Sequence, residues 1–318
     1  MTAKKLKSTL GDTSVMAIAL AFALFGIMSL MRPDAFSLTS VATVLANSSL
    51  LLFASAGQMV VITSGGIDLS VGSLMSTTAC LAVEIMNGNN DMLIPVIIIC
   101  MAFGFLVGMI NGFAVAYVKI PALIMTLCMS NVLTKFQPIF TGAYPRGTVS
   151  QQFADALSQR YLEFIPGFFI YALVFYIAFV LIMKRTQYGS RLNLVGTNLT
   201  ASTLCGIRSK RVIMLSYAIA GLIAGLGGVV GAGYFRQLQI ATFDGYTMQS
   251  VAAVVIGGSV LSGGKPNYFG TFTGTIMLVM LSLFLSTINT AVPIRSIIMG
   301  AVLILLLIMY NRKPTIRQ

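Results

Sequence analysis

The chain has 318 residues, of which 57% are hydrophobic and 9% are charged, with 20 Lys and Arg against 8 Asp and Glu and no His. Soluble chains carry about 25% charged residues, so this composition excludes a soluble domain and favours an all-α integral membrane protein. Without His, and without metal-ligand spacing or a nucleophile–base pair, we expect no metal, no cofactor, no catalytic residue and no enzymatic activity.

Apolar runs long enough to cross a bilayer recur along the chain and predict about ten transmembrane helices. The first run follows a lysine cluster and is too long for the apolar core of a signal peptide, so we expect it to be retained. The run at 247–262 is short for a full crossing, which leaves a broken or re-entrant segment open. The predicted helices cover residues 14–31, 41–63, 69–86, 92–117, 121–140, 166–183, 212–233, 247–262, 268–287 and 294–310.

The lysines and arginines border these runs in clusters, which is the pattern that orients membrane helices rather than a nucleic-acid surface. It places both termini on the cytoplasmic side of a single transmembrane domain, residues 1–318. The two long loops are then a periplasmic one at about 141–165 and a basic cytoplasmic one at about 184–211. The positions that decide this are Lys4, Lys5, Lys7, Lys184, Arg185, Arg191, Arg208, Lys210, Arg211, Arg312, Lys313 and Arg317.

The segment GQMVVITSGGIDLSVGS, residues 57–73, places a carboxylate and a glycine pair between two apolar runs. Placing a charged residue inside a membrane costs free energy, so we expect Asp68 to have a structural or functional role. One interpretation is an N-cap for the helix that restarts at Leu69, with Ser70 as a second capping group. The other is contact with a transport path or a partner subunit. The residues alone leave both open.

Glycines are spread through the apolar runs, where small residues allow helices to pack closely. The tract 221–233, the series Gly104, Gly108 and Gly112, and the pair Gly270 and Gly274 predict such packing. The strings at 61–73 and 254–264 also resemble each other, as in transporters built from repeated halves. No GxxxxGK[ST] phosphate loop occurs, so ATP is not bound by that route.

A few uncharged amides lie within the predicted helices and suit a neutral polar solute, whereas an ion-coupled carrier would bury several carboxylates. Helix–helix hydrogen bonding is the alternative role for each of them. The candidates for a translocation path are Asn47, Gln58, Asp68, Ser70, Asn111 and Gln249, with Asn131 and Asn289 as further membrane-buried amides.

The cytoplasmic loop is predicted to contain a short helix that starts near Asn198 and stops at Gly206, because Asn is a good N-cap and Gly a good C-terminal stop. A short helix in such a loop can dock a soluble partner.

Four motifs, GQMVVITSGGIDLSVGS, IPALIMTL (120–127), GTNLTASTLCGI (196–207) and AAVVIGGSVLSGG (252–264), occur in order along nearly the whole chain. Together they resemble the permease subunits of ATP-binding-cassette importers of the ribose and simple-sugar class, including autoinducer-2 importers. The resemblance implies a type II importer-like helical bundle in the bacterial inner membrane. Its solute would be a pentose, a hexose or autoinducer-2.

The resemblance also implies partners: a cytoplasmic ATPase subunit that hydrolyses ATP, a periplasmic solute-binding protein, and a second permease copy or related chain. Family acids are absent at Thr247 and Gln249, so a heterodimer with a chain that keeps them is a further hypothesis. A stand-alone secondary transporter or channel for a neutral polar solute is the alternative function. The resemblance assigns ATPase coupling to Asn198, Thr200, Ala201, Leu204, Gly206 and Ile207, and structural roles to Gly65, Gly66, Gly257, Gly258, Gly263 and Gly264.

Overall fold

The computed structural model describes residues 13–31, 37–142, 144–161, 164–236 and 238–287, together with 291, 294, 297, 298, 300 and 301. Within these ranges nearly all regular structure is helical, as expected, apart from a hairpin of β1 (Arg160–Tyr161) and β2 (Ile165–Pro166). The helices are α2 (Thr13–Met31), α3 (Leu38–Thr63), α4 (Val71–Met86), η2 (Asn90–Met92), α5 (Leu93–Phe113), η3 (Ala114–Val118), α6 (Ala122–Thr141), α7 (Gln151–Ser158), α8 (Gly167–Arg185), α9 (Gln187–Thr197), α10 (Leu199–Leu204), α11 (Ser209–Phe235), α12 (Tyr246–Ile256) and α13 (Tyr268–Thr287).

Six helical segments of the described chain are long and apolar enough to cross a membrane: α3, the continuous stretch Asn90–Val118, α6, α8, α11 and α13. The predicted helix at 247–262 is wrong at its end, because α12 stops at Ile256 and the chain then turns. The predicted helix at 294–310 lies outside the described residues over most of its length, and Asn289 lies outside them as well.

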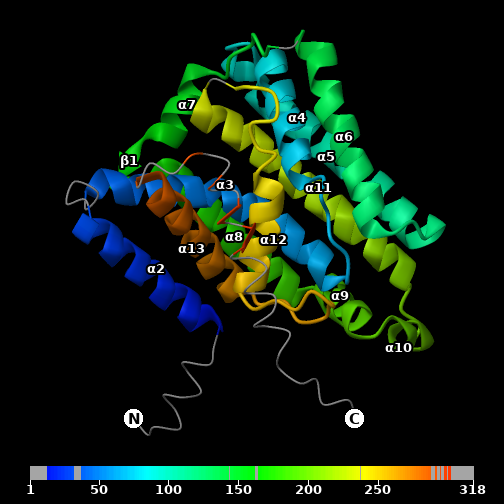
Figure 1. Cartoon of the computed structure of the whole chain (residues 1–318). Coiled ribbons are helices and arrows are strands. Elements are labelled where there is room, and N and C mark those ends of the chain that lie inside the picture. Colours follow the sequence, from blue (N-terminus) through cyan, green and yellow to red (C-terminus); the bar gives the residue numbers. More distant parts are fainter. Residues whose placement is uncertain are drawn as a thin grey trace, which may run out of the picture.

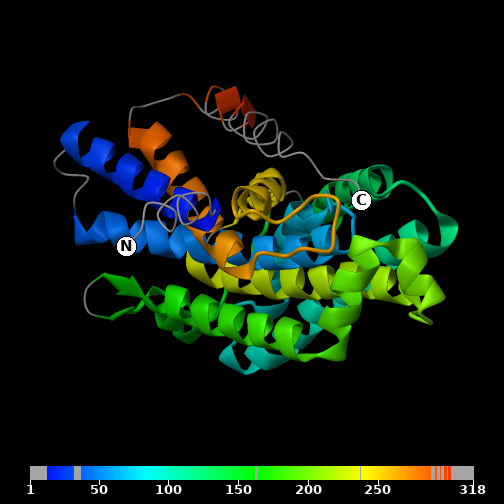
Figure 2. The same cartoon turned by 90° about the horizontal axis from the view of Figure 1, so that it is seen from below.

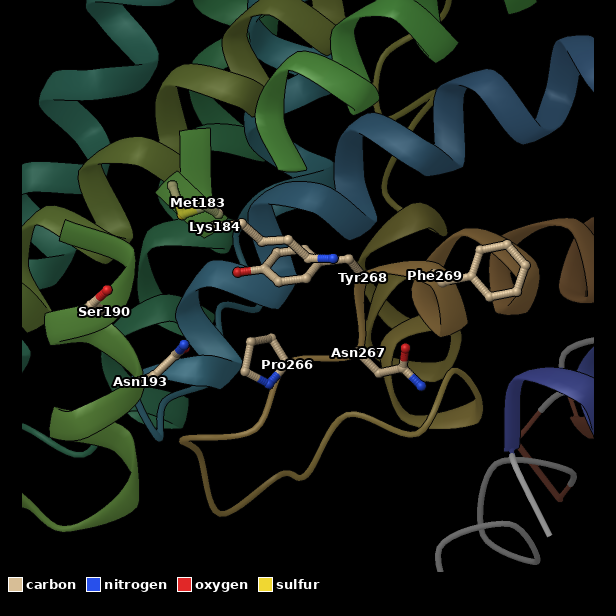
Figure 3. A pocket seen from close by; sticks show the side chains of 8 residues that line it. All are labelled: Met183, Lys184, Ser190, Asn193, Pro266, Asn267, Tyr268 and Phe269. Carbon is tan, nitrogen blue, oxygen red and sulfur yellow. The ribbon is translucent and has the colours of Figure 1, made fainter. Parts of the chain in front are cut away.

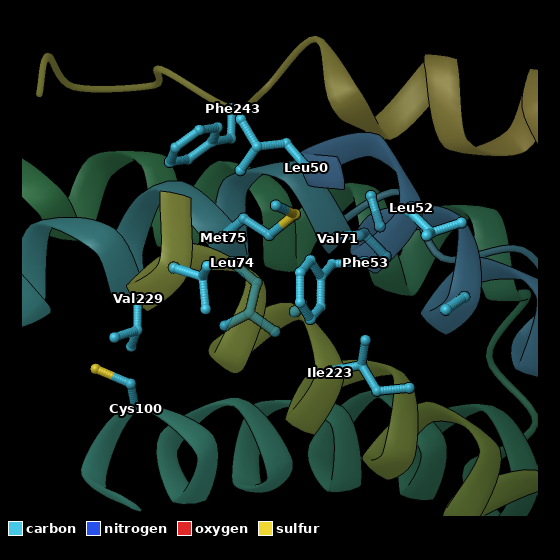
Figure 4. Packing of buried hydrophobic residues seen from close by; sticks show 14 of the residues in the cluster. Leu50, Leu52, Phe53, Val71, Leu74, Met75, Cys100, Ile223, Val229 and Phe243 are labelled. Carbon is cyan, nitrogen blue, oxygen red and sulfur yellow. The ribbon is translucent and has the colours of Figure 1, made fainter. Parts of the chain in front are cut away.

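The bundle is built around α11, which packs against α3, α4 and α5. In Figure 1, α5 and α6 lie on one side of α11, α2 and α13 lie on the other, and α9 and α10 lie together at one end. Figure 2 shows α8 on the face of the bundle opposite α2 and α13, where it packs on α3. The core between α3, α4 and α11 is formed by large buried side chains, including Leu52, Phe53, Leu74, Met75 and Ile223 (Figure 4).

The glycines of α5 and α11 bring these two helices into backbone contact, as the small-residue pattern predicts. A Cβ on Gly104 would collide with the carbonyl oxygen of Gly221, and a Cβ on Gly108 would collide with that of Tyr217. In a membrane, where apolar burial between helices gains little, such close approach is a main source of packing energy. The α5–α11 pair is therefore the rigid centre of the bundle.

Helix α3 ends in a Schellman cap at its glycine pair. Gly65 adopts a left-handed φ of 88°, its N–H donates to the Ile62 carbonyl at 2.9 Å, and the Gly66 N–H donates to the Val61 carbonyl at 3.1 Å. A side chain at Gly65 would be strained in this conformation, so glycine is required there.

Helix α12 ends in the same way. Gly258 also has a φ of 88°, its N–H donates to the Val255 carbonyl at 2.8 Å, and the Ser259 N–H donates to the Val254 carbonyl at 3.1 Å. The two similar strings in the sequence therefore encode one repeated helix stop, with Gly65 matching Gly258.

These stops meet α9 at one end of the bundle. The Gly264 N–H donates to the Thr63 carbonyl at 2.9 Å, and a Cβ on Gly196 of α9 would collide with that same carbonyl. Gly263 lies against both Gly196 and Gly65. The ends of α3 and α9 and the turn after α12 are thus joined through backbone contacts that only glycines permit.

Candidate functional site

A polar cavity of about 290 Å³ opens between α3, α12 and α13. It brings together Asn47 and Gln249, two of the path candidates, although they are far apart in the sequence. The other polar residues of its wall are Tyr246, Ser282 and Ser286. The remaining described lining consists of Val279 and Leu283, so none of the described wall residues is charged at neutral pH.

The polar groups of this cavity are not used by the protein itself. No hydrogen bond joins the amides of Asn47 and Gln249, or the hydroxyls of Ser282 and Ser286, to another group in the part of the chain that the structure describes. Amides and hydroxyls each offer both a donor and an acceptor. The wall is therefore suited to bind a neutral solute that carries several hydroxyl groups.

Sequence reasoning missed the contribution of α13 to this cavity. Ser282 and Ser286 are four residues apart, so they share one face of the helix. Serines in an apolar helix commonly bond to their own backbone, which gave no reason to single them out. Their spacing was the available signal, and it becomes informative only once Asn47 and Gln249 are known to lie opposite.

The remaining path candidates form a separate, fully buried network at the turn between α3 and α4. Asp68 is 1% exposed, and its Oδ1 accepts from the Ser70 N–H at 2.8 Å and from the Ser70 hydroxyl at 2.6 Å. Asn111 of α5 donates to the Ser70 hydroxyl oxygen at 3.0 Å. In the amide orientation that its surroundings favour, Gln58 bonds both the N–H and the carbonyl of Asp68. None of these four residues lines the polar cavity.

The predicted capping role of Asp68 is wrong in its position. Helix α4 begins at Val71 rather than Leu69, and Ser70 occupies the N-cap without a side-chain cap bond. The orphan N–H of Gly72 donates instead to the Thr247 hydroxyl of α12 at 2.9 Å. A helix N-terminus attracts negative or electron-rich groups, and here a neutral hydroxyl from another helix fills that place.

The short helix predicted in the cytoplasmic loop is present as α10. The Asn198 side chain accepts from the Ala201 N–H at 2.9 Å, and Gly206 follows the helix with a left-handed φ of 80°. Leu204 is 83% exposed and Leu199 is 52% exposed, so α10 presents apolar side chains outward. Helix α9, just before it, was missed because most of its residues are polar or glycine.

The other coupling candidates occupy the same short segment. Thr200 and Ala201 lie in the first turns of α10, and the Ile207 N–H donates to the Ser202 carbonyl at 3.1 Å, which closes the helix end. The six residues are thus gathered in one protruding element, shown beside α9 in Figure 1.

Comparison with known proteins places the chain among membrane permeases. A family model described as branched-chain amino acid transport system / permease component matches residues 39–307. The ribose import permease protein of Escherichia coli K12 is 29% identical over 294 residues, 91% of each chain. The fructose import permease protein of Bifidobacterium longum is 30% identical over 85% of this chain and 77% of its own length. The autoinducer 2 import system permease protein of Photorhabdus luminescens is 26% identical over 96% of this chain and 92% of its own. No solved structure matches the chain.

Proposed function

We propose a function on the basis of the family to which this chain belongs, the branched-chain amino acid transport system permease components. The chain is the membrane-spanning subunit of an ATP-driven importer of a small sugar or sugar-like solute. The observation that carries the solute class is the cavity between α3, α12 and α13, whose free groups are amides and hydroxyls. A free amino acid would bring an ammonium and a carboxylate, and burying these needs charged or multiple hydrogen-bonding partners. The import permeases for ribose, fructose and autoinducer 2 among the relatives agree with a hydroxyl-rich solute.

The proposed translocation path runs past Asn47 and Gln249 rather than past Asp68. Asp68, Ser70, Gln58 and Asn111 are hydrogen-bonded to one another at the turn between α3 and α4, so their role in this proposal is to hold that turn. The Asn111 side-chain oxygen alone among them is buried without a partner in the described residues. The residues that exchange hydrogen bonds with the solute are then those whose side chains form none with other described residues, Asn47, Gln249, Ser282 and Ser286.

The proposed power source is a separate cytoplasmic ATPase subunit that docks on α10. The outward-facing Leu199 and Leu204 on a rigidly capped helix support this, because exposed apolar anchors on a fixed element are typical of partner contacts. A periplasmic solute-binding protein would deliver the solute to the other side. Residues 1–318 would form one permease domain of the inner membrane with both termini cytoplasmic, paired with a second copy or a related permease.

Transport assays on cavity variants test this proposal. The chain, with its ATPase and binding protein in proteoliposomes, is offered labelled pentoses and hexoses. Asn47→Leu and Gln249→Leu each remove hydrogen bonds to the solute, worth about 0.5–1.5 kcal/mol apiece, so uptake should fall roughly two- to tenfold.

Thr43→Val is the matched control, because the Thr43 hydroxyl on α3 donates to its own helix backbone and does not line the cavity. Uptake in this variant should equal that of the native chain. Native sugar uptake by both leucine variants, or uptake of branched-chain amino acids but no sugar, would contradict the proposal.

A further inference from the structure

Two cavities of opposite character meet at Phe269, at the start of α13. The polar cavity, about 410 Å³, lies between the end of α8, α9 and the turn before α13, and Lys184, Ser190, Asn193 and Tyr268 are part of its wall. The apolar cavity, about 380 Å³, lies between α2, α3 and α13. Phe269 lines both. Figure 3 shows its ring turned to the opposite side from Tyr268, so it stands between the two spaces.

The polar cavity has an unneutralised positive charge. The Lys184 Nζ lies 5.5 Å from the centre of the Tyr268 ring, which positions the ammonium at the cavity (Figure 3). Among the described residues the one ion pair joins Arg236 and Asp155, so Lys184 has no carboxylate partner there. An ammonium held in place without a counter-charge attracts an anion.

Asn193 adds a second, different requirement to this cavity. Its side-chain oxygen is buried and has no hydrogen-bond partner among the described residues, and Figure 3 shows its amide nitrogen turned toward the cavity. This nitrogen can donate a hydrogen bond to an oxygen of a bound molecule. The cavity therefore fits a group that combines a negative charge with hydroxyl oxygens.

The apolar cavity lies where α2 stands away from α3. Helix α2 packs chiefly on α13, and the space beside it is lined by aliphatic and aromatic side chains. Among the described residues of that wall, the one hydroxyl is on Thr273, and it donates to the Gly270 carbonyl at 3.0 Å. Phe22 is 72% exposed and Phe269 is 60% exposed, so the groove is open at its side. A water molecule in this groove would have no hydrogen-bond partners, whereas a hydrocarbon chain would contact apolar groups along its length.

We propose that these joined cavities bind one anionic phospholipid, with its phosphate at Lys184, headgroup hydroxyls at Asn193 and an acyl chain in the groove between α2, α3 and α13. The two cavities adjoin at Phe269, whose side chain is exposed, so the proposed lipid would cross over this ring with its headgroup on one side and its acyl chain on the other. Phosphatidylglycerol has the required chemistry, because its headgroup carries one phosphate and two hydroxyls. Such a lipid would fill the gap between α2 and α3 and link the start of α13 to α9, next to the docking helix α10.

Lipid retention by the purified full-length chain tests this site. The protein is exchanged in detergent with phosphatidylglycerol or phosphatidylcholine, and bound lipid is measured by native mass spectrometry. Lys184→Gln should lower phosphatidylglycerol retention about fivefold, since one basic residue contributes about that factor to binding an anionic lipid. Val41→Trp, which fills the groove from α3, should lower it as well.

The matched controls are Arg185→Gln, the neighbouring basic residue outside the cavity wall, and Thr39→Trp on the exposed part of α3. Both should retain the native amount of phosphatidylglycerol. Inorganic phosphate should not displace the lipid, and displacement by it would instead identify a site for free phosphate. Equal retention in Lys184→Gln and Arg185→Gln, or equal binding of phosphatidylcholine and phosphatidylglycerol, would overturn the proposal.

Discussion

Asp244 shows how one carboxyl outside the spanning helices can make the fold sensitive to pH. It lies between α11 and α12, where its carboxylate accepts from the Ser76 hydroxyl at 3.1 Å and from the Thr134 hydroxyl at 3.5 Å. Partial burial raises the pKa of this carboxyl above its ordinary value, and the two hydrogen bonds oppose the rise without cancelling it. Three segments, α4, α6 and the α11–α12 connection, therefore meet at one titrating group.

The sign of the resulting pH dependence follows from the raised pKa. The protonated carboxyl is favoured in the folded state, so its contribution to stability is complete below pH ~3.8 and is lost as the pH rises through the higher folded pKa. Asp244→Asn removes this dependence. We expect the native chain to lose thermal stability relative to Asp244→Asn between pH 4 and 7, measured by unfolding midpoints in detergent. A constant difference across this range would contradict the assignment.

At the scale of single residues, the sequence identified the right kinds of side chain but not their neighbours. Asn47, Gln249, Gln58 and Asn111 are all amides in apolar helices, and nothing local separates them. The structure separates them by what they face, because two border a cavity and two are bonded within the turn at Asp68. The neighbour of an amide side chain is set by tertiary structure. The sequence could therefore name a set of candidate residues for the path, but it could not select those that border the cavity.

At the scale of elements, apolar length predicted the limits of several long helices well, because that length must match the bilayer. It does not give their number, since about ten spanning helices are predicted and six segments of the described chain are long and apolar enough to cross a membrane. The helices at 122–141, 167–185 and 268–287 start and end within two residues of their predicted limits. The end of α12 was missed because the residues after Ile256 remain weakly apolar while Gly258 turns the chain. Helix α7 was missed because it is short and lies in a polar loop, where hydropathy carries no signal.

The end of α10 gives a test at the same scale. Gly206 holds a φ of 80° with open space around it, so a larger residue there is opposed by backbone strain rather than by a collision. For a β-branched residue this strain costs about 1–2 kcal/mol or more. That cost is large relative to the small stability of a helix of six residues. Gly206→Val should reduce ATP-driven uptake several-fold while the chain stays folded and its ATPase partner keeps hydrolysing ATP.

Gly206→Asn is the matched variant, because Asn tolerates the left-handed conformation and is found at helix ends. It should retain most of the coupling between ATP hydrolysis and uptake, measured as solute molecules transported per ATP. If the valine variant transported as efficiently as the asparagine variant, α10 would not transmit the motion.

At the scale of the whole molecule, the described residues offer little to couple an ion gradient to solute movement. No group of three or more Cys, Asp or Glu that could hold a metal ion occurs among them, and the buried carboxylate of Asp68 is committed to Ser70. A carrier driven by protons or sodium needs titrating or cation-binding groups along its path. The described wall of the cavity at Asn47 and Gln249 has only neutral groups at physiological pH.

Vesicles that contain this chain alone should therefore show no concentrative uptake of sugar under an imposed proton or sodium gradient. Vesicles that also contain the ATPase and the binding protein should accumulate sugar when ATP is supplied, and ionophores that collapse the gradients should leave that uptake unchanged. The reason is that, in the proposed mechanism, the work of moving the solute enters through α10 and not through the cavity wall. Accumulation by the chain alone that follows the gradient and ignores ATP would assign the energy source to the permease itself.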